Sequence, residues 1–123
     1  MARVLVVDDV LESVNLISIV LHADGHECHA VSSPAQAFAM LKAKPFDLVI
    51  SDQNMPGMSG ETLLERVRVL WPDTKRLMLT ADPRVRNDEG RAYPVIYKPF
   101  RLPELRSAVT ALLSRRGITP PSS

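Results

Sequence analysis

Residues 3–9 read Arg-Val-Leu-Val-Val-Asp-Asp, an apolar run that ends in two carboxylates. A short apolar run of this kind is typical of a strand buried on both faces of a sheet. Residues 10–23 then place apolar side chains at helical spacing, and Asp24 and Gly25 provide a stop for that helix. The chain therefore begins with a strand followed by a helix, the unit from which parallel sheets are built.

The same alternation continues along the chain. Further strands are predicted at residues 27–31, 48–50, 76–79 and 95–97, and further helices from Pro34 to Lys44, from Ser59 to Pro72 and from Pro103 to Gly117. Residues 81–93 are polar and poorly periodic, so the fourth helix should be short or irregular. The pattern predicts an α/β fold: a doubly wound, five-stranded parallel sheet with helices on both faces.

Helix starts and buried faces can be predicted in more detail. Asp9, with Glu12 three residues on, is expected to cap the first helix, while Ser33 and Ser59 cap the second and third. The buried faces should contain Leu11, Val14, Ile17 and Leu21 in the first helix, Leu63, Val67 and Leu70 in the third, and Leu102, Leu105, Val109 and Leu112 in the last.

Length and composition limit the classes of function. The 123 residues suit one domain, expected over residues 1–117, with 118–123 as a disordered tail or linker stub. A net charge of +1 gives no general reason to expect nucleic-acid binding, and no apolar run is long enough to span a membrane. The single cysteine, Cys28, cannot form an internal disulfide, and the N-terminus lacks the pattern of a signal peptide, so a cytoplasmic location is expected.

Charge is distributed unevenly along the chain. Residues 1–65 carry a net charge of −6, whereas residues 66–123 carry +7. One interpretation is that these are two solvated faces of opposite sign. The other is that the first half builds an acidic site and the second half a basic surface for a partner.

Polar residues stand where the predicted strands end. Asp8 and Asp9 close the first strand, Asp52 the third, Thr80 the fourth and Lys98 the fifth. The carboxyl ends of parallel strands share one edge of the sheet, where ligands bind. Clustered carboxylates repel each other unless a cation lies among them, and oxygen ligands suit Mg²⁺. Together with a lysine and a hydroxyl for phosphate oxygens, this set favours phosphoryl transfer to a carboxylate nucleophile.

Four segments together resemble the signature of a known family. They are residues 6–9 (Val-Val-Asp-Asp), 52–60 (Asp-Gln-Asn-Met-Pro-Gly-Met-Ser-Gly), 79–81 (Leu-Thr-Ala) and 98–100 (Lys-Pro-Phe). In this order they resemble the receiver domains of two-component response regulators, the CheY-like family, and the resemblance extends over about residues 3–116. It implies a flavodoxin-like fold in which phosphorylation occurs on an aspartate.

The resemblance also implies roles for individual residues. Asp52 corresponds to the phosphoacceptor, Thr80 to the hydroxyl that reorients toward the phosphate, and Lys98 to the phosphate-binding lysine, whose peptide bond to Pro99 is cis in the family. The ligands of Mg²⁺ or Mn²⁺ would be Asp8 (directly or through water), Asp9, Asp52 and the backbone carbonyl of Asn54. The donor would be a sensor histidine kinase or a histidine phosphotransfer protein.

Rival classes fit less well. A haloacid-dehalogenase-type phosphatase requires a second aspartate where this chain has Asn54, and a flavodoxin-like cofactor binder requires a Ser/Thr/Gly-rich loop where this chain has Asp8 and Asp9. The chain is thus expected to be a signalling domain that catalyses only its own phosphorylation and dephosphorylation. A stand-alone relay and a receiver cut from a longer chain with an enzymatic or DNA-binding output both remain open.

Two departures from the family concern the output. Many receivers carry an aromatic residue three positions before the lysine, where this chain has Val95, and the stretch between Thr80 and Lys98 is shorter than usual. We expect phosphorylation to rearrange residues 81–93 above all, and a downstream protein partner to bind through residues 81–106.

Overall fold

The computed structural model of the chain describes residues 1–86 and 92–114. Its strands are β1 (Arg3–Val7), β2 (Glu27–Val31), β3 (Leu48–Ser51), β4 (Lys75–Thr80) and β5 (Val95–Tyr97). The helices among the described residues are α1 (Leu11–Ala23), α2 (Pro34–Ala43), α3 (Gly60–Leu70) and α4 (Leu102–Ser114). The strands form one parallel sheet in the order β2-β1-β3-β4-β5, which confirms the predicted doubly wound α/β fold.

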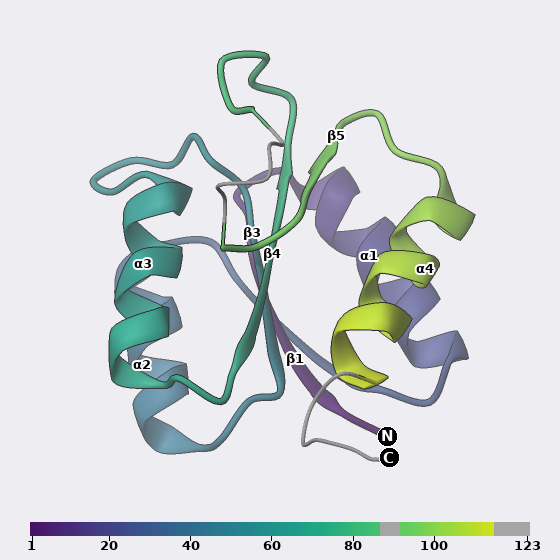
Figure 1. The fold of residues 1–123 in the computed structure, drawn as a ribbon, viewed down its shortest axis with the longest axis horizontal. Coiled ribbons are helices and arrows are strands. Elements are labelled where there is room, and N and C mark those ends of the chain that lie inside the picture. Colours follow the sequence, from purple (N-terminus) through teal and green to yellow (C-terminus); the bar gives the residue numbers. More distant parts are fainter. Residues whose placement is uncertain (87–91, 115–123) are drawn as a thin grey trace.

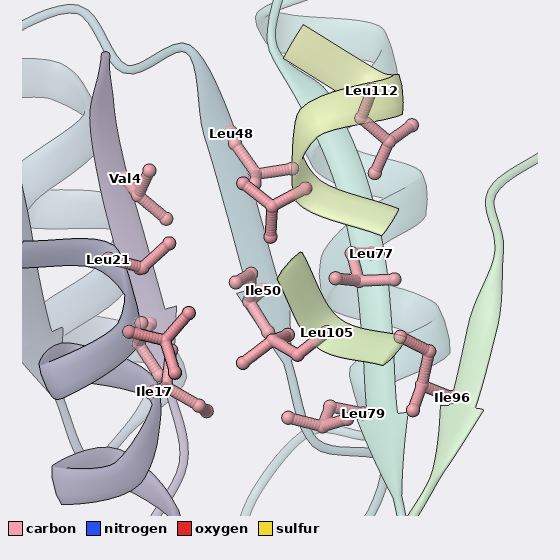
Figure 2. Packing of buried hydrophobic residues seen from close by; sticks show 13 residues of the cluster. Val4, Ile17, Leu21, Leu48, Ile50, Leu77, Leu79, Ile96, Leu105 and Leu112 are labelled. Atoms are coloured by element: carbon pink, nitrogen blue, oxygen red, sulfur yellow. The ribbon is translucent and has the colours of Figure 1, made fainter. Parts of the chain in front are cut away.

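The helices cover the sheet on both faces, with α1 and α4 on one side and α2 and α3 on the other (Figure 1). Alternate residues of each central strand point to opposite faces, so each strand contributes to two apolar layers. Figure 2 shows the first layer, in which Ile17 and Leu21 of α1 and Leu105 of α4 pack over Ile50 and Leu79 of the sheet. The second layer lies beneath α2 and α3. Burial on both faces explains why the strands are continuous apolar runs.

Two of the three predicted helix caps are present. The backbone N–H of Gln36 donates to Ser33 Oγ, and that of Thr62 donates to Ser59 Oγ, both at 3.2 Å. The predicted cap of α1 by Asp9 is wrong: the N-cap residue is Val10, and its side chain makes no capping bond. Asp9 therefore lies one residue before the cap position and outside the geometry of a capping box.

Three residues predicted to be buried are exposed: Leu11, Leu70 and Leu102, which keep 71%, 57% and 40% of their surface. Each is the first or last residue of its helix, where packing on one side is missing. The other predicted core residues are buried, apart from the partly buried Val14. The predicted helix end at Gly117 and the tail 118–123 lie outside the described residues.

The connection from β4 to β5 is the irregular part of the fold. Residues 81–86 and 92–94 contain no helix, and residues 87–91 lie outside the described part of the chain. The sequence predicted a short or irregular helix over residues 81–93. The described part of that segment is irregular, and the rest of it lies outside the described residues. In the described residues no helix has the length and apolar character needed to cross a membrane.

Candidate metal and phosphoryl-acceptor site

Three carboxylates converge at the carboxyl edge of the sheet. Asp8 and Asp9 follow β1 and Asp52 follows β3, and these two strands are hydrogen-bonded neighbours. One carboxylate oxygen of each residue lies within 4.8 Å of the others. Asp8 and Asp52 are buried, whereas Asp9 is exposed, so the cluster opens to solvent on the side of Asp9.

Backbone hydrogen bonds hold two of these residues in place. The N–H of Asp8 donates to Val31 O at 3.1 Å and the N–H of Asp52 to Val7 O at 3.0 Å, so each extends the sheet ladder by one residue. Asp8 Oδ1 then accepts from Val10 N at 2.8 Å, and Asp52 Oδ1 accepts from Gln53 N at 2.7 Å. Each carboxylate is thereby oriented through its first oxygen, and its second oxygen, Oδ2, is left for another partner.

Lys98 brings a positive charge to those second oxygens. Its Nζ donates to Asp8 Oδ2 at 2.7 Å and lies 3.7 Å from Asp52 Oδ2, and its side chain is only 13% exposed. The backbone N–H of Lys98 donates to Thr80 O at 2.8 Å, which continues the β4–β5 pairing to this edge. The peptide bond to Pro99 is cis, as the family resemblance implied.

Thr80 lies fully buried at the end of β4, on the same edge of the sheet. Its Oγ1 accepts a hydrogen bond from the backbone N–H of Asp82 at 3.1 Å. A threonine hydroxyl can accept one such bond and still donate its own proton elsewhere. Thr80 is therefore able to donate toward a ligand at the carboxylates if its side chain turns.

Asn54 and Asp82, which follow Asp52 and Thr80 by two residues each, are joined by a hydrogen bond. Asn54 Nδ2 donates to Asp82 Oδ2 at 3.1 Å, and Arg84 donates to both carboxylate oxygens of Asp82 at 3.0 and 2.9 Å. The side-chain and backbone hydrogen bonds from Arg84, followed by the one from Asn54, hold the pKa of Asp82 well below its usual range. From the sequence, Arg84 was expected on a surface for an acidic partner, and its pairing with Asp82 was not predicted.

Gly60 lies against the main chain of the central aspartate. Its N–H donates to Gln53 O at 2.8 Å, and a Cβ built on it would lie 2.0 Å from the carbonyl oxygen of Asp52. Only glycine allows α3 to begin this close to the end of β3. The start of α3 thus fixes the backbone that carries Asp52.

The donor set fits a divalent cation. Three carboxylates and one ammonium leave an excess of negative charge, and the available oxygens are hard ligands. Like-charged groups at these distances raise one another's energy unless a cation compensates them. Asp8, Asp9, Asp52, Thr80 and Lys98 all lie at this edge of the sheet, and their roles there stay predictions.

A five-stranded parallel sheet of this order, with such a cluster at its carboxyl edge, is the arrangement of response regulator receiver domains. The family model described as the response regulator receiver domain matches residues 4–110. The chain belongs to this family, as the sequence analysis inferred.

Curated relatives are longer proteins. The response regulator protein FleR of Pseudomonas aeruginosa is 39% identical over 103 residues, which are 80% of this chain and 22% of FleR. The phosphate regulon transcriptional regulatory protein PhoB of the same organism is 33% identical over 120 residues, which are 93% of this chain and 52% of PhoB. This chain therefore spans between about a fifth and a half of these relatives.

Solved structures are similar over most of their length. The response regulator TrrA of Thermotoga maritima, described in complex with Mg(2+)-BeF, has a TM-score of 0.82 and 32% identity; the match covers 92% of this chain and all of TrrA. The chemotaxis response regulator CheY4 of Vibrio cholerae has a TM-score of 0.81 and 30% identity, over 92% of this chain and 99% of CheY4. The fold of the whole receiver module is thus shared.

Proposed function

We propose that Asp52 accepts a phosphoryl group from a phosphohistidine of a sensor histidine kinase or a histidine phosphotransfer protein. The observation that carries this proposal is the position of Asp52: a buried carboxylate beside two others, with one oxygen facing the ammonium of Lys98. In the transfer, a carboxylate oxygen of Asp52 bonds to phosphorus while the P–N bond to histidine breaks. The bonding electrons return to the imidazole, so no further reactant is required.

The neighbouring side chains suit the charge that this transfer moves. Lys98 lies 3.7 Å from Asp52 Oδ2 and can pair with a phosphoryl oxygen there. Thr80 has a hydroxyl proton to donate to a second oxygen. These contacts form only when the phosphoryl group arrives, so they favour transfer rather than mere binding of the donor.

Asp8, Asp9 and Asp52, with the backbone carbonyl of Asn54, would hold Mg²⁺ or Mn²⁺. When bound, the ion supplies positive charge for the phosphoryl oxygens and relieves the repulsion within the cluster. The observation in favour is the set of three carboxylates within 4.8 Å of one another. TrrA, a relative of similar fold, is described in complex with Mg(2+)-BeF.

The product of the reaction is the phosphorylated domain itself, and no small molecule is released as its output. The domain, taken as residues 1–117, catalyses only its own phosphorylation and dephosphorylation in the cytoplasm, and a downstream protein reads its state through residues 81–106. Arg101 in that range is exposed and favours an acidic partner, whereas the charge of Arg84 is already paired with Asp82. Because the curated relative PhoB is described as a transcriptional regulatory protein, a second candidate is a receiver within a longer chain that carries a DNA-binding output.

Phosphorylation of the Asp52→Asn variant tests the assignment. The amide keeps the shape of the side chain and removes the nucleophile, so labelling by a small phosphodonor with Mg²⁺ should be lost. Asp73→Asn is a matched control, since Asp73 is an exposed aspartate at the opposite end of the sheet, before β4. Full labelling of Asp52→Asn, or loss of labelling in both variants, would contradict the assignment.

A further inference from the structure

The register of β4 and β5 makes Tyr97 the direct neighbour of Thr80. In this parallel pair Met78 lies opposite Val95 and Thr80 opposite Tyr97. Paired residues of adjacent strands point to the same face of a sheet. The side chains of Thr80 and Tyr97 therefore lie on the same face of the sheet, whereas Val95 lies two residue pairs further from the carboxyl edge.

Thr80 and Tyr97 hold the two ends of one short segment. Thr80 Oγ1 accepts from Asp82 N at 3.1 Å, and the Tyr97 hydroxyl donates to Val85 O at 2.5 Å. Between them, Val85 N donates to Asp82 O at 3.3 Å and closes a turn over residues 82–85. The segment thus depends on the hydroxyl groups of two residues that are paired on adjacent strands.

A movement of the Thr80 side chain should affect residues 82–85. Asp82 is buried, and its N–H has the Thr80 hydroxyl as acceptor. If that hydroxyl turns toward a phosphoryl group on Asp52, the N–H must follow it or lose its partner, and a buried N–H without a partner is costly. If the N–H follows the hydroxyl, residue 82 is displaced relative to Val85, which is 4% exposed and whose carbonyl is held by Tyr97.

We propose that Tyr97 is a positioning residue for the phosphorylated state: its hydrogen bond to Val85 holds the 82–85 turn in the unphosphorylated arrangement and opposes reorientation of Thr80. This inference rests on the proposed phosphorylation of Asp52. Tyr97 would then couple the site to the β4–β5 connection in a chain that has valine, not an aromatic residue, at position 95. Tyr97 as a whole residue is 40% exposed, so a downstream partner can contact it directly.

The affinity for beryllofluoride, a phosphoryl mimic, tests the role of Tyr97. The bond to Val85 stabilises only the unphosphorylated arrangement, so Tyr97→Phe should bind beryllofluoride more tightly in saturating Mg²⁺. A net hydrogen-bond contribution of 0.5–1.5 kcal/mol corresponds to about a 2- to 13-fold gain in affinity. The control is Tyr93→Phe, which removes the hydroxyl of the only other tyrosine and should leave the affinity unchanged.

Calorimetric titration of the full chain separates the outcomes. If Tyr97 has only a structural role, Tyr97→Phe lowers the unfolding temperature and binds beryllofluoride with the affinity of the unaltered protein. That result overturns the inference, and so does weaker binding of beryllofluoride by the variant. If the unaltered protein itself fails to bind beryllofluoride, the proposed function fails and the inference with it. A second measurement needs no variant: beryllofluoride should change hydrogen exchange at the amides of Asp82 and Val85 by tenfold or more, and unchanged exchange there also overturns the inference.

Discussion

Replacing Gly60 by alanine should disturb the phosphoryl acceptor through its backbone. The added Cβ would lie 2.0 Å from the carbonyl oxygen of Asp52 and 2.9 Å from Cα of Gln53, whereas ordinary contacts lie at 3.4–4 Å. Even the tightest contact that real Cβ atoms make, 3.0 Å, requires the two backbones to separate by about 1 Å. Both neighbours are main-chain atoms, so no side chain can rotate to relieve the clash.

The magnitude follows from opposing contributions. Overpacking of this kind costs about 1–3 kcal/mol, and loss of the Gly60 N–H bond to Gln53 O costs about 1 kcal/mol. Alanine recovers about 1 kcal/mol through its higher helix propensity at the start of α3. The net destabilisation should therefore be about 1–3 kcal/mol. A shift of about 1 Å at Asp52 should also slow phosphorylation of the folded protein roughly 100-fold.

Denaturant unfolding and phosphorylation by a small phosphodonor measure the two effects separately. Gly25→Ala is the control, because Gly25 has φ +85° with open space around it, at the C-terminal end of α1. That variant should lose about 1–2 kcal/mol to backbone strain and keep its phosphorylation rate. If Gly60→Ala is as stable as the unaltered protein and is phosphorylated at the same rate, the close approach of α3 to Asp52 does not constrain the site.

Three further substitutions test the neighbours of Asp52. Asp9→Asn should weaken Mg²⁺ binding about tenfold or more while raising the unfolding temperature of the metal-free protein, since it removes one of three clustered charges; equal Mg²⁺ affinities in a titration would remove Asp9 from the site. Lys98→Ala should slow phosphorylation more than it weakens Mg²⁺ binding, because an ammonium pairs with phosphate and cannot ligate the ion; the reverse order of effects would make Lys98 structural. Asp82→Ala removes the hydrogen bonds of Asn54 and Arg84 to Asp82 and should change the lifetime of the aspartyl phosphate. An unchanged decay rate would show that these three side chains have no part in hydrolysis.

The arrangement of the fold and most of the site were predictable because they depend on simple periodicities. Continuous apolar runs indicate strands buried on both faces, and the carboxyl ends of parallel strands must share an edge. Those two rules alone bring Asp8, Asp52 and Lys98 together, although as many as 90 residues separate the members of the Lys98–Asp8 pair. The motif resemblance then supplied the roles, which sequence periodicity does not contain.

The errors and omissions concern features that depend on atomic position. Asp9 missed the cap of α1 by one residue, and Leu11 is exposed because it is the first residue of its helix. The bond from Tyr97 to Val85 depends on the register that places Tyr97 opposite Thr80, and no sequence pattern specifies that register. Such features follow from tertiary packing, which overrides local preference.

Lys98 lies between Asp8, a proposed metal ligand, and Asp52, the proposed phosphoryl acceptor. Its ammonium lies closer to Asp8 than to Asp52, at 2.7 and 3.7 Å, so it mainly compensates the charge of a carboxylate that we propose as a metal ligand. A metal ion at Asp8 would release Lys98 toward Asp52, and a phosphoryl group on Asp52 would draw Lys98 in the same direction. Both changes favour the same movement, so metal and phosphoryl group should each increase the affinity for the other, by equal factors. A lysine shared unequally between the two carboxylates therefore suits this site better than one paired only with the acceptor.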